Sequence, residues 1–215
     1  MAGIAVMPMF PLGTVLLPGA VLPLHVFEPR YRQLVIDCLA NDSGDPEFGV
    51  ALIERGWEVG GGDERSDVGT VARMARVEAL EGGRYAIVAV GTRRIRVNAW
   101  LPDDPYPIAD VDDWPDDDVD QPELRERVDD LTSRLADVLA LAAQLGEAPA
   151  EIDLGMISDD PVLATYHLTA LAPIGPADTY RLLCAPNPAA RLDGLGSALD
   201  DAEAVLRFRL GGAPD

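Results

Sequence analysis

The sequence predicts an α+β protein, with a twisted β-sheet or pseudo-barrel at the N-terminus and a helical bundle at the C-terminus. Residues 1–115 consist of short runs rich in Val and Leu that are separated by turn residues, which is typical of a small barrel or sandwich. Seven aspartates lie within residues 110–120 and mark a boundary. Residues 116–215 show helical apolar periodicity, so we expect two domains, 1–115 and 116–215.

Prolines and glycines divide the first domain into strand-length segments. Pro18-Gly19 is a turn dipeptide, and we expect strands at 14–17 and 20–27 on its two sides. Pro29 fits the first turn of a helix, because its missing N–H costs nothing there. A hairpin turn is expected at 81–83 between two further strands, and the full set of later strands is 48–54, 68–79, 84–91, 93–100 and 106–111.

Four helix start signals follow the boundary. Gln121-Pro122 opens a long helix whose apolar residues form one stripe, and Gly146 ends it. The segment 158–161 (Ser-Asp-Asp-Pro) is a strong start signal for a second helix. Gly175-Pro176 and Asn187-Pro188 open the third and fourth helices, and two glycines weaken the middle of the fourth, Gly194 and Gly196. Four helices with short connections predict a compact bundle.

Three sequence blocks resemble the N-terminal domain of Lon proteases and occur in that family's order. They are FPLGTVLLPGAVLPLHVFEPRYRQLV at 10–35, VGTVARM at 68–74, and GGRY at 82–85 followed by VGTRRIRV at 90–97. The helical residues 121–210 resemble that domain less sharply. The resemblance implies a PUA-like β-fold for residues 1–115, a helical subdomain for 116–215, and a part in substrate recognition and oligomer assembly.

The residue types exclude several kinds of catalysis. All 17 basic residues are arginine, so the sequence contains no Walker A lysine, no Schiff-base lysine and no Ser-Lys peptidase dyad. We therefore expect a stand-alone Lon N-terminal domain without the ATPase and peptidase. His25 and His167 lack a zinc motif and are expected to be structural. The aspartate run lacks calcium-loop spacing and is expected to be a solvated linker. We predict no catalytic residue, metal site or cofactor.

Charge and hydropathy predict a cytoplasmic protein that binds neither nucleic acid nor membrane. The formal net charge is −20, and residues 1–100 hold 10 arginines against 12 acidic residues, so the excess lies in the second half. Such a chain repels phosphates and anionic lipids. No run reaches the ~20 apolar residues of a membrane span, and a secretory signal is not expected. Cys38 and Cys184 are expected to be reduced thiols in the core.

The predicted function is binding of unfolded or client proteins and peptides, or of a partner protease, without cleavage. The chain would act as an adaptor, a chaperone-like holder or a competitor for a protease's clients. Trp57, between glycines in a polar loop, is the candidate contact residue, because tryptophan often anchors interfaces. The alternative that Trp57 folds back onto the β-domain stays open. The aromatic and apolar residues of the first block are expected in the core, namely Phe10, Leu12, Phe27 and Tyr31.

Two alternative functions are kept. An RNA-binding PUA-like module is one, because positive charge concentrates at Arg73, Arg76, Arg84, Arg93, Arg94 and Arg96. Pairing of Arg94 and Arg96 with Glu78 and Glu81 would count against it. The other is a small-ligand sensor with an apolar pocket between the two domains. The sequence leaves the oligomeric state, the clients and the location of the binding surface open.

Overall fold

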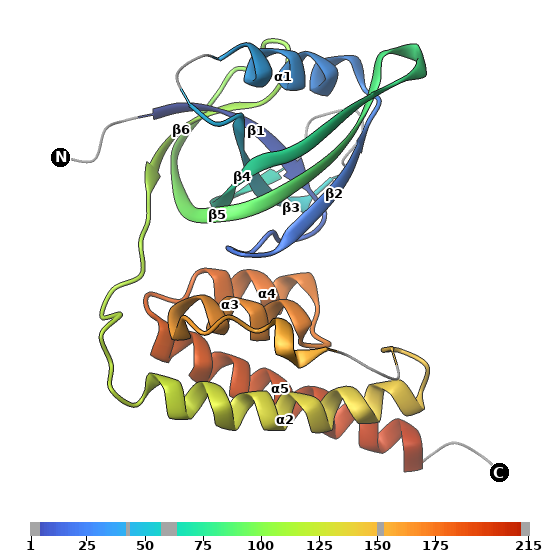
Figure 1. Ribbon diagram of the computed structural model, residues 1–215, viewed down its shortest axis with the longest axis vertical. Helices are drawn as coiled ribbons and strands as arrows, with labels where there is room; N and C mark the ends of the chain where they lie inside the picture. The colour runs from blue at the N-terminus through green and yellow to red at the C-terminus, as the bar shows by residue number, and fades with distance from the viewer. Residues whose placement is uncertain (1–4, 42–43, 57–63, 150–152, 212–215) are drawn as a thin grey trace. The chain divides into compact units, whose positions relative to one another are not determined.

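We describe the protein from a computed structural model, which defines residues 5–41, 44–56, 64–149 and 153–211. Contacts within the chain group it into two units, Met1–Pro115 and Asp116–Asp215. In the described residues, the first (the β-unit) holds a six-stranded sheet and α1, and the second (the helical unit) holds four α-helices (Figure 1). The predicted α+β fold class is confirmed.

The sheet of the β-unit closes on itself. Its strands are β1 (Ala5–Leu12), β2 (Val21–Val26), β3 (Glu47–Arg55), β4 (Glu64–Leu80), β5 (Arg84–Leu101) and β6 (Ile108–Asp113). Their order is β2-β5-β4-β3-β1-β6, and β6 also pairs with β5. Strands β5, β4, β3, β1 and β6 therefore form a closed ring. β2 is not part of the ring and, within the described residues, pairs only with β5. β1 and β3 run parallel, whereas the other pairs are antiparallel.

Strand β5 is long enough to pair with two different strands on one edge. Residues 85–90 pair with β2, residues 95–101 pair with β6, and β4 follows the opposite edge. The sequence predicted two strands here, at 84–91 and 93–100. The structure has a single strand, because Gly91 keeps its place in the ladder opposite Ala72. The hairpin turn predicted at 81–83 is confirmed as a short 3₁₀ turn.

The loop between β1 and β2 is held against the sheet by two Val-Gly-Thr triplets, at 68–70 and 90–92. Thr70 donates its hydroxyl proton to the Leu16 carbonyl (2.6 Å). A Cβ atom on Gly91 would lie 2.2 Å from the Leu17 carbonyl oxygen, so only glycine allows this approach. The strand predicted at 14–17 is therefore wrong. The Leu16 carbonyl accepts from the Thr70 side chain and the Leu17 carbonyl accepts from the Ala20 N–H within a turn, so neither carbonyl pairs with a neighbouring strand. The first strand is the preceding segment, β1.

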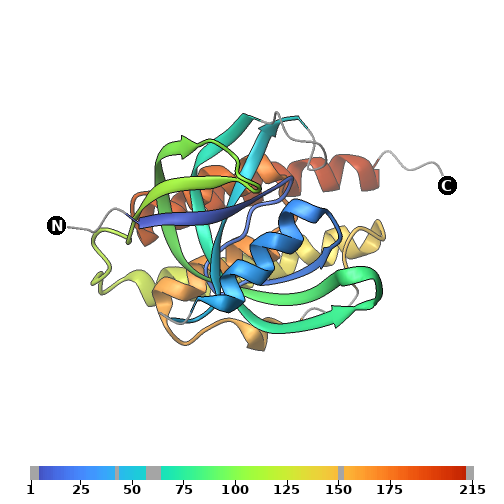
Figure 2. The same ribbon diagram turned by 90° about the horizontal axis from the view of Figure 1, so that it is seen from above.

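Helix α1 (Pro29–Ala40) begins, as predicted, with Pro29 in its first turn. Its inner face contributes Tyr31, Leu34, Val35 and Cys38 to the core. The Tyr31 ring stacks on Phe10 of β1, with centroids 4.0 Å apart and planes 9° from parallel. Figures 1 and 2 show α1 lying over one end of the ring of strands. This packing closes that end with aromatic and aliphatic side chains.

The helical unit contains α2 (Leu124–Gln144), α3 (Pro161–Leu171), α4 (Pro176–Leu183) and α5 (Pro188–Gly211). Asp160 caps α3 by accepting from the Val162 N–H (2.9 Å), and Asn187 accepts from the Ala190 N–H at the start of α5 (2.8 Å). The long helices α2 and α5 pack along one another (Figure 1). The predicted four-helix bundle is confirmed, and α5 is continuous through both of its glycines.

The aspartate run is not solvated throughout. Its first members belong to β6, where Asp113 binds Arg93 (2.9 Å). The side chain of Asp116 is buried, and its carboxylate accepts from the Arg191 guanidinium (2.6 Å) and the Tyr166 hydroxyl (2.7 Å). The prediction of a solvated linker is wrong for Asp116, because a buried arginine neutralises its charge.

Arg191 of α5 is the centre of this buried network. Its side chain is 0% exposed, and it also donates to the Thr165 hydroxyl (2.9 Å) and the Leu182 carbonyl (3.2 Å). Its guanidinium carbon lies 3.7 Å from the centroid of the Tyr166 ring. The network joins the segment before α2 to α3, α4 and α5.

Candidate functional site

Large apolar side chains are exposed on and beside strand β2. Leu22 and Leu24 pack against the core, and the residues that alternate with them, Val21, Pro23 and His25, face outward. Val21 is 64% exposed and Phe27 is 55% exposed. Val88, opposite Pro23 on strand β5, is 38% exposed. We call Val21, Pro23, Phe27 and Val88 the β2 surface. Exposed apolar side chains gathered in one place mark a surface that contacts other molecules.

Two shallow hollows meet at the β2 surface. One, of about 410 Å³, lies on the sheet beside β4 and β5 and includes Arg76 and Glu78. The other, of about 190 Å³, lies between β2 and the start of α1 and reaches the stacked Tyr31. Both hollows are lined by Pro23, Leu24 and His25. An apolar floor with polar groups at its margin is the arrangement found at protein interfaces.

The backbone edge of β2 is less suited to binding than its side chains. Among the described strands, β2 pairs only with β5 and leaves its other edge open. Pro23 lies in this edge strand and has no N–H, so a strand added there would lack one ladder hydrogen bond. Proline in an edge strand hinders pairing with another chain. A partner would therefore be held by apolar side chains.

Five of the six arginines considered for RNA binding lie beside acidic or aromatic groups, and the sixth, Arg84, donates to the Glu81 carbonyl. Arg93 donates to Glu47 (2.8 Å) and to Asp113. Arg94 and Arg96 place their guanidinium groups 4.4 and 4.2 Å from the centroid of the Trp114 ring. The pairing with Glu78 that the sequence left open does not occur, because Arg94 lies opposite Thr70 on β4 whereas Glu78 lies opposite Ala86. Arg73 and Arg76 pair with Asp45 and Glu78. This arrangement does not favour a phosphate backbone, which would have to displace these partners.

The residues singled out from the sequence have different positions. Trp57 lies outside the described residues, so its contact role stays a prediction. Phe10, Leu12 and Tyr31 are buried as predicted, but the core prediction was wrong for Phe27. Phe27 follows Val26, the last core-facing residue of β2, so strand alternation turns it outward. That alternation is the signal that could have identified it from the sequence.

The two histidines differ in their surroundings. His25 is exposed on β2 and lines both hollows at the β2 surface. His167 of α3 accepts a hydrogen bond at Nδ1 from the Ser158 N–H (3.1 Å). Burial lowers the pKa of His167, so its ring is neutral at pH 7 and able to accept this bond. Within the described ranges, no group of three His, Cys, Asp or Glu residues is placed to hold a metal ion.

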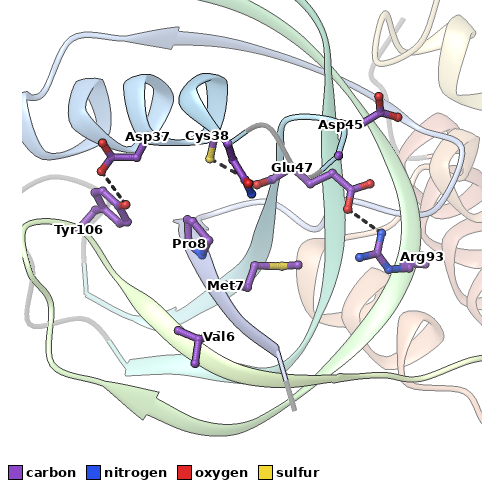
Figure 3. A pocket seen from close by; sticks show the side chains of 11 residues that line it. Val6, Met7, Pro8, Asp37, Cys38, Asp45, Glu47, Arg93 and Tyr106 are labelled. Atoms are coloured by element: carbon purple, nitrogen blue, oxygen red, sulfur yellow. Dashed lines mark hydrogen bonds and ion pairs between the residues drawn. The ribbon is translucent and has the colours of Figure 1, made fainter. Parts of the chain in front are cut away.

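A larger hollow, of about 670 Å³, opens between β1, α1 and the start of β3 (Figure 3). We call it the β1–α1 hollow. Met7 and Pro8 of β1 lie between its two polar ends (Figure 3). At one end the Tyr106 hydroxyl donates to Asp37 (2.8 Å), and at the other Arg93 binds Glu47. Its volume is typical of ligand sites.

Cys38, in the wall of the β1–α1 hollow, is an unreactive thiol. Burial and the negative charge of Asp37 raise its pKa to about 12. Burial and Asp37 raise the pKa of Tyr106 as well. Both groups are protonated at pH 7, and the thiol donates to the Glu47 carbonyl (3.3 Å). Because the thiolate is the reactive form of cysteine, Cys38 has a structural role.

We expect stability to fall as the pH rises above about 9. The unfolded chain releases the Cys38 proton near its ordinary pKa of 9.0, whereas the folded chain keeps it until about 12. The folded state then binds more protons, so alkaline pH favours unfolding. Urea unfolding should show a free energy lower by roughly 1–2 kcal/mol at about pH 10.5 than at pH 8. Cys38→Ala should show a smaller loss, and an equal loss in both proteins would contradict this account.

Comparison with known proteins gives one consistent match. The family model of the ATP-dependent protease La (LON) substrate-binding domain matches residues 6–201, in both units. Lon protease 2 of Sorangium cellulosum is 32% identical over 160 residues, which is 72% of this chain. The Lon protease of Flavobacterium johnsoniae is 29% identical over 140 residues, or 65% of this chain. The matches span only 17% and 16% of those two relatives.

Solved structures show the same fold. A Lon N-terminal domain protein from Xanthomonas campestris is similar with a TM-score of 0.67 and 29% identity, over 90% of this chain and 98% of that one. The N-terminal domain of the Mycobacterium avium complex Lon protease gives a TM-score of 0.65 at 20% identity, over 92% of this chain and 99% of that domain. The second likeness concerns the fold alone. No described helix is both long and apolar enough to cross a lipid bilayer.

Proposed function

The chain belongs to the family of the Lon (ATP-dependent protease La) substrate-binding domain, and from this premise we propose that it binds segments of client proteins or peptides without cleaving them. The observation that carries the proposal is the β2 surface, with Val21 and Phe27 more than half exposed. Within this chain no lysine is available for a Ser-Lys dyad. Its part is recognition, as an adaptor or a chaperone-like holder acting in the cytoplasm.

The chemistry of the β2 surface selects the kind of client. Burying apolar side chains contributes about 25 cal/mol per Å², less the cost of ordering the partner. Unfolded proteins expose such apolar segments, whereas folded ones keep them inside. The adjacent Arg76 and Glu78 supply both signs of charge at the margin. The net charge of −20 repels acidic clients and speeds the approach of basic ones.

Replacing Phe27 should weaken client binding while leaving the fold intact. A fluorescein-labelled casein, which is unfolded in solution, serves as the client in an anisotropy titration at 0.3 M NaCl, because casein is acidic and the salt screens its repulsion by this acidic chain. Phe27→Ser should raise the Kd about tenfold, because an aromatic anchor contributes roughly 1–2 kcal/mol. Its unfolding free energy should stay within about 0.5 kcal/mol of the original, since Phe27 is mostly exposed.

The matched control is Phe208→Ser, which removes a phenylalanine that is 81% exposed on α5. This variant should bind casein as the unmodified protein does. Equal weakening by both variants would mean that binding follows general hydrophobicity and not the β2 surface. Failure of the unmodified protein to bind casein at tens of micromolar would reject the proposed function. Trp57→Ala in the same titration tests the loop contact predicted from the sequence.

A further inference from the structure

Asp37 has two neutral hydrogen-bond donors and no cationic partner among the described residues. The Tyr106 hydroxyl donates to Oδ2 (2.8 Å), and the Gln33 amide donates to Oδ1 (2.7 Å). These donors fix the orientation of the carboxylate without cancelling its charge. Tyr106 is itself only 8% exposed and Asp37 is half-buried, so this end of the β1–α1 hollow is built from a hydrogen-bonded, partly buried pair.

The arginine that lines the same hollow does not balance Asp37. Arg93 is held by Glu47 (2.8 Å) and Asp113 (2.9 Å), so its positive charge is already matched. Asp45 also lines the hollow, and it pairs with the exposed Arg73 at 3.3 Å. Burial is the main cause of the raised pKa of Cys38, and the negative charge of Asp37 adds to it. An anionic ligand would be repelled from this hollow, and a neutral one would leave Asp37 uncompensated.

Between its polar ends the hollow is apolar. Val6, Met7 and Pro8 of β1 line this part, and Figure 3 shows Met7 and Pro8 between the Asp37–Tyr106 pair and the Glu47–Arg93 pair. Such a surface fits a hydrocarbon stem of a few carbon atoms. Arginine and lysine side chains combine that stem with a terminal cation, and a guanidinium also matches the two oxygens of a carboxylate.

We propose that the β1–α1 hollow binds a guanidinium or ammonium group on a short apolar stem, with Asp37 as the counter-ion and Met7 and Pro8 against the stem. The ligand is either a basic side chain of a bound protein segment or a free organic cation. This site is separate from the β2 surface and does not depend on the function proposed for it.

A pair of isosteric probes tests the site in the unmodified protein. Butylguanidinium carries the cation, and butylurea has nearly the same shape without the charge. Calorimetric titration should show that butylguanidinium binds at least tenfold tighter, with amide shifts in an NMR titration at Met7 and Cys38. Equal affinity of the two probes, or shifts confined to other regions, would overturn the proposal. This comparison needs no variant and therefore holds whether or not a substitution folds.

Variants then identify the counter-ion. Asp37→Asn should weaken butylguanidinium binding at least tenfold, whereas Asp67→Asn, at an exposed position of β4 outside the hollow, should leave it unchanged. Val6→Trp, at a rim residue that is 64% exposed, should block the hollow without changing its charge. Unchanged binding in Asp37→Asn would overturn the assignment. Phe27→Ser should bind the probe normally, which separates this test from that of the β2 surface.

The source of the cation is decided with blocked amino acids. N-acetyl-arginine amide imitates a side chain within a protein, and N-acetyl-citrulline amide is its neutral isostere. Binding of the arginine compound at the same residues, and not of the citrulline compound, supports a protein segment as occupant. Binding of butylguanidinium alone supports a free organic cation. Binding of the charged probes should weaken in 1 M NaCl. If this salt displaced neither butylguanidinium nor the arginine compound, the result would contradict a site that depends on charge.

Discussion

Arg191→Ala is expected to lower the unfolding free energy of the helical unit by about 3–5 kcal/mol. The substitution removes the Arg191 guanidinium from the buried ion pair with Asp116 and removes the donors to Thr165 and Leu182. Urea unfolding followed by circular dichroism at 222 nm reports mainly on the helices. A loss of this size is a large part of the stability of an ordinary domain, so we expect the variant to be partly unfolded at 37 °C.

The matched control for Arg191 lies on the same helix. Arg207 is 68% exposed and pairs with Glu203 one turn away, so Arg207→Ala should change the stability by less than about 0.5 kcal/mol. A double-mutant cycle with Asp116→Asn should show strong non-additivity, because the two substitutions remove the two members of the same buried ion pair. Additive effects, or a loss in Arg191→Ala no larger than in the control, would mean that the buried pair does not hold this unit together.

Gly91→Ala is expected to cost the β-unit about 3 kcal/mol, at the upper end of the range for overpacking. The new Cβ would lie 2.2 Å from the Leu17 carbonyl oxygen, and this is a backbone atom that cannot rotate away. The loop would have to move and would strain the bonds between Gly91 and residues 19 and 20. All three tryptophans lie in residues 1–115, so their fluorescence reports on unfolding of the β-unit.

Gly44→Ala is the control for this substitution. A Cβ on Gly44 would meet no heavy atom within 4 Å, so we expect its stability to stay within about 0.5 kcal/mol of the original. Gly69→Ala should behave like Gly91→Ala, because its Cβ would lie 2.3 Å from the Val50 carbonyl oxygen. If Gly91→Ala were as stable as Gly44→Ala, the close approach of the Leu17 carbonyl to Gly91 would not be what holds the β1–β2 loop against the sheet.

The sequence predicted those elements whose signals are local. Pro29 marked the start of α1, the aspartate at 160 capped α3, and the glycines at 82 and 83 closed the β4–β5 hairpin. Each depends on the conformation that one or two residues allow. The strand predicted at 14–17 failed, because its backbone is held by Thr70 and Gly91, which are far away in the sequence. Contacts of that kind leave no periodic signal in the segment itself.

The candidate sites were harder to predict for a similar reason. Phe27 was predicted in the core because it ends a largely apolar segment, and only its place after the inward-facing Val26 shows that it is exposed. The β1–α1 hollow joins Met7, Asp37 and Tyr106, which come from three separated segments. The sequence does not distinguish Asp116 from the other aspartates of its run, because its burial depends on Arg191, which is 75 residues away. A site whose side chains are brought together by the closed sheet or by the bundle can be predicted only once the fold is known.

Site-specific photocrosslinking at the β2 surface is the most direct test of client binding. Phe27→benzoylphenylalanine extends the exposed ring with a light-activated benzoyl group, and Phe208→benzoylphenylalanine does the same on α5. With labelled casein present, irradiation should give a crosslinked product at position 27 that exceeds the one at position 208 at least tenfold, and an excess of unlabelled casein should abolish it. Equal crosslinking at the two positions, or none at position 27, would contradict the claim that the β2 surface binds clients.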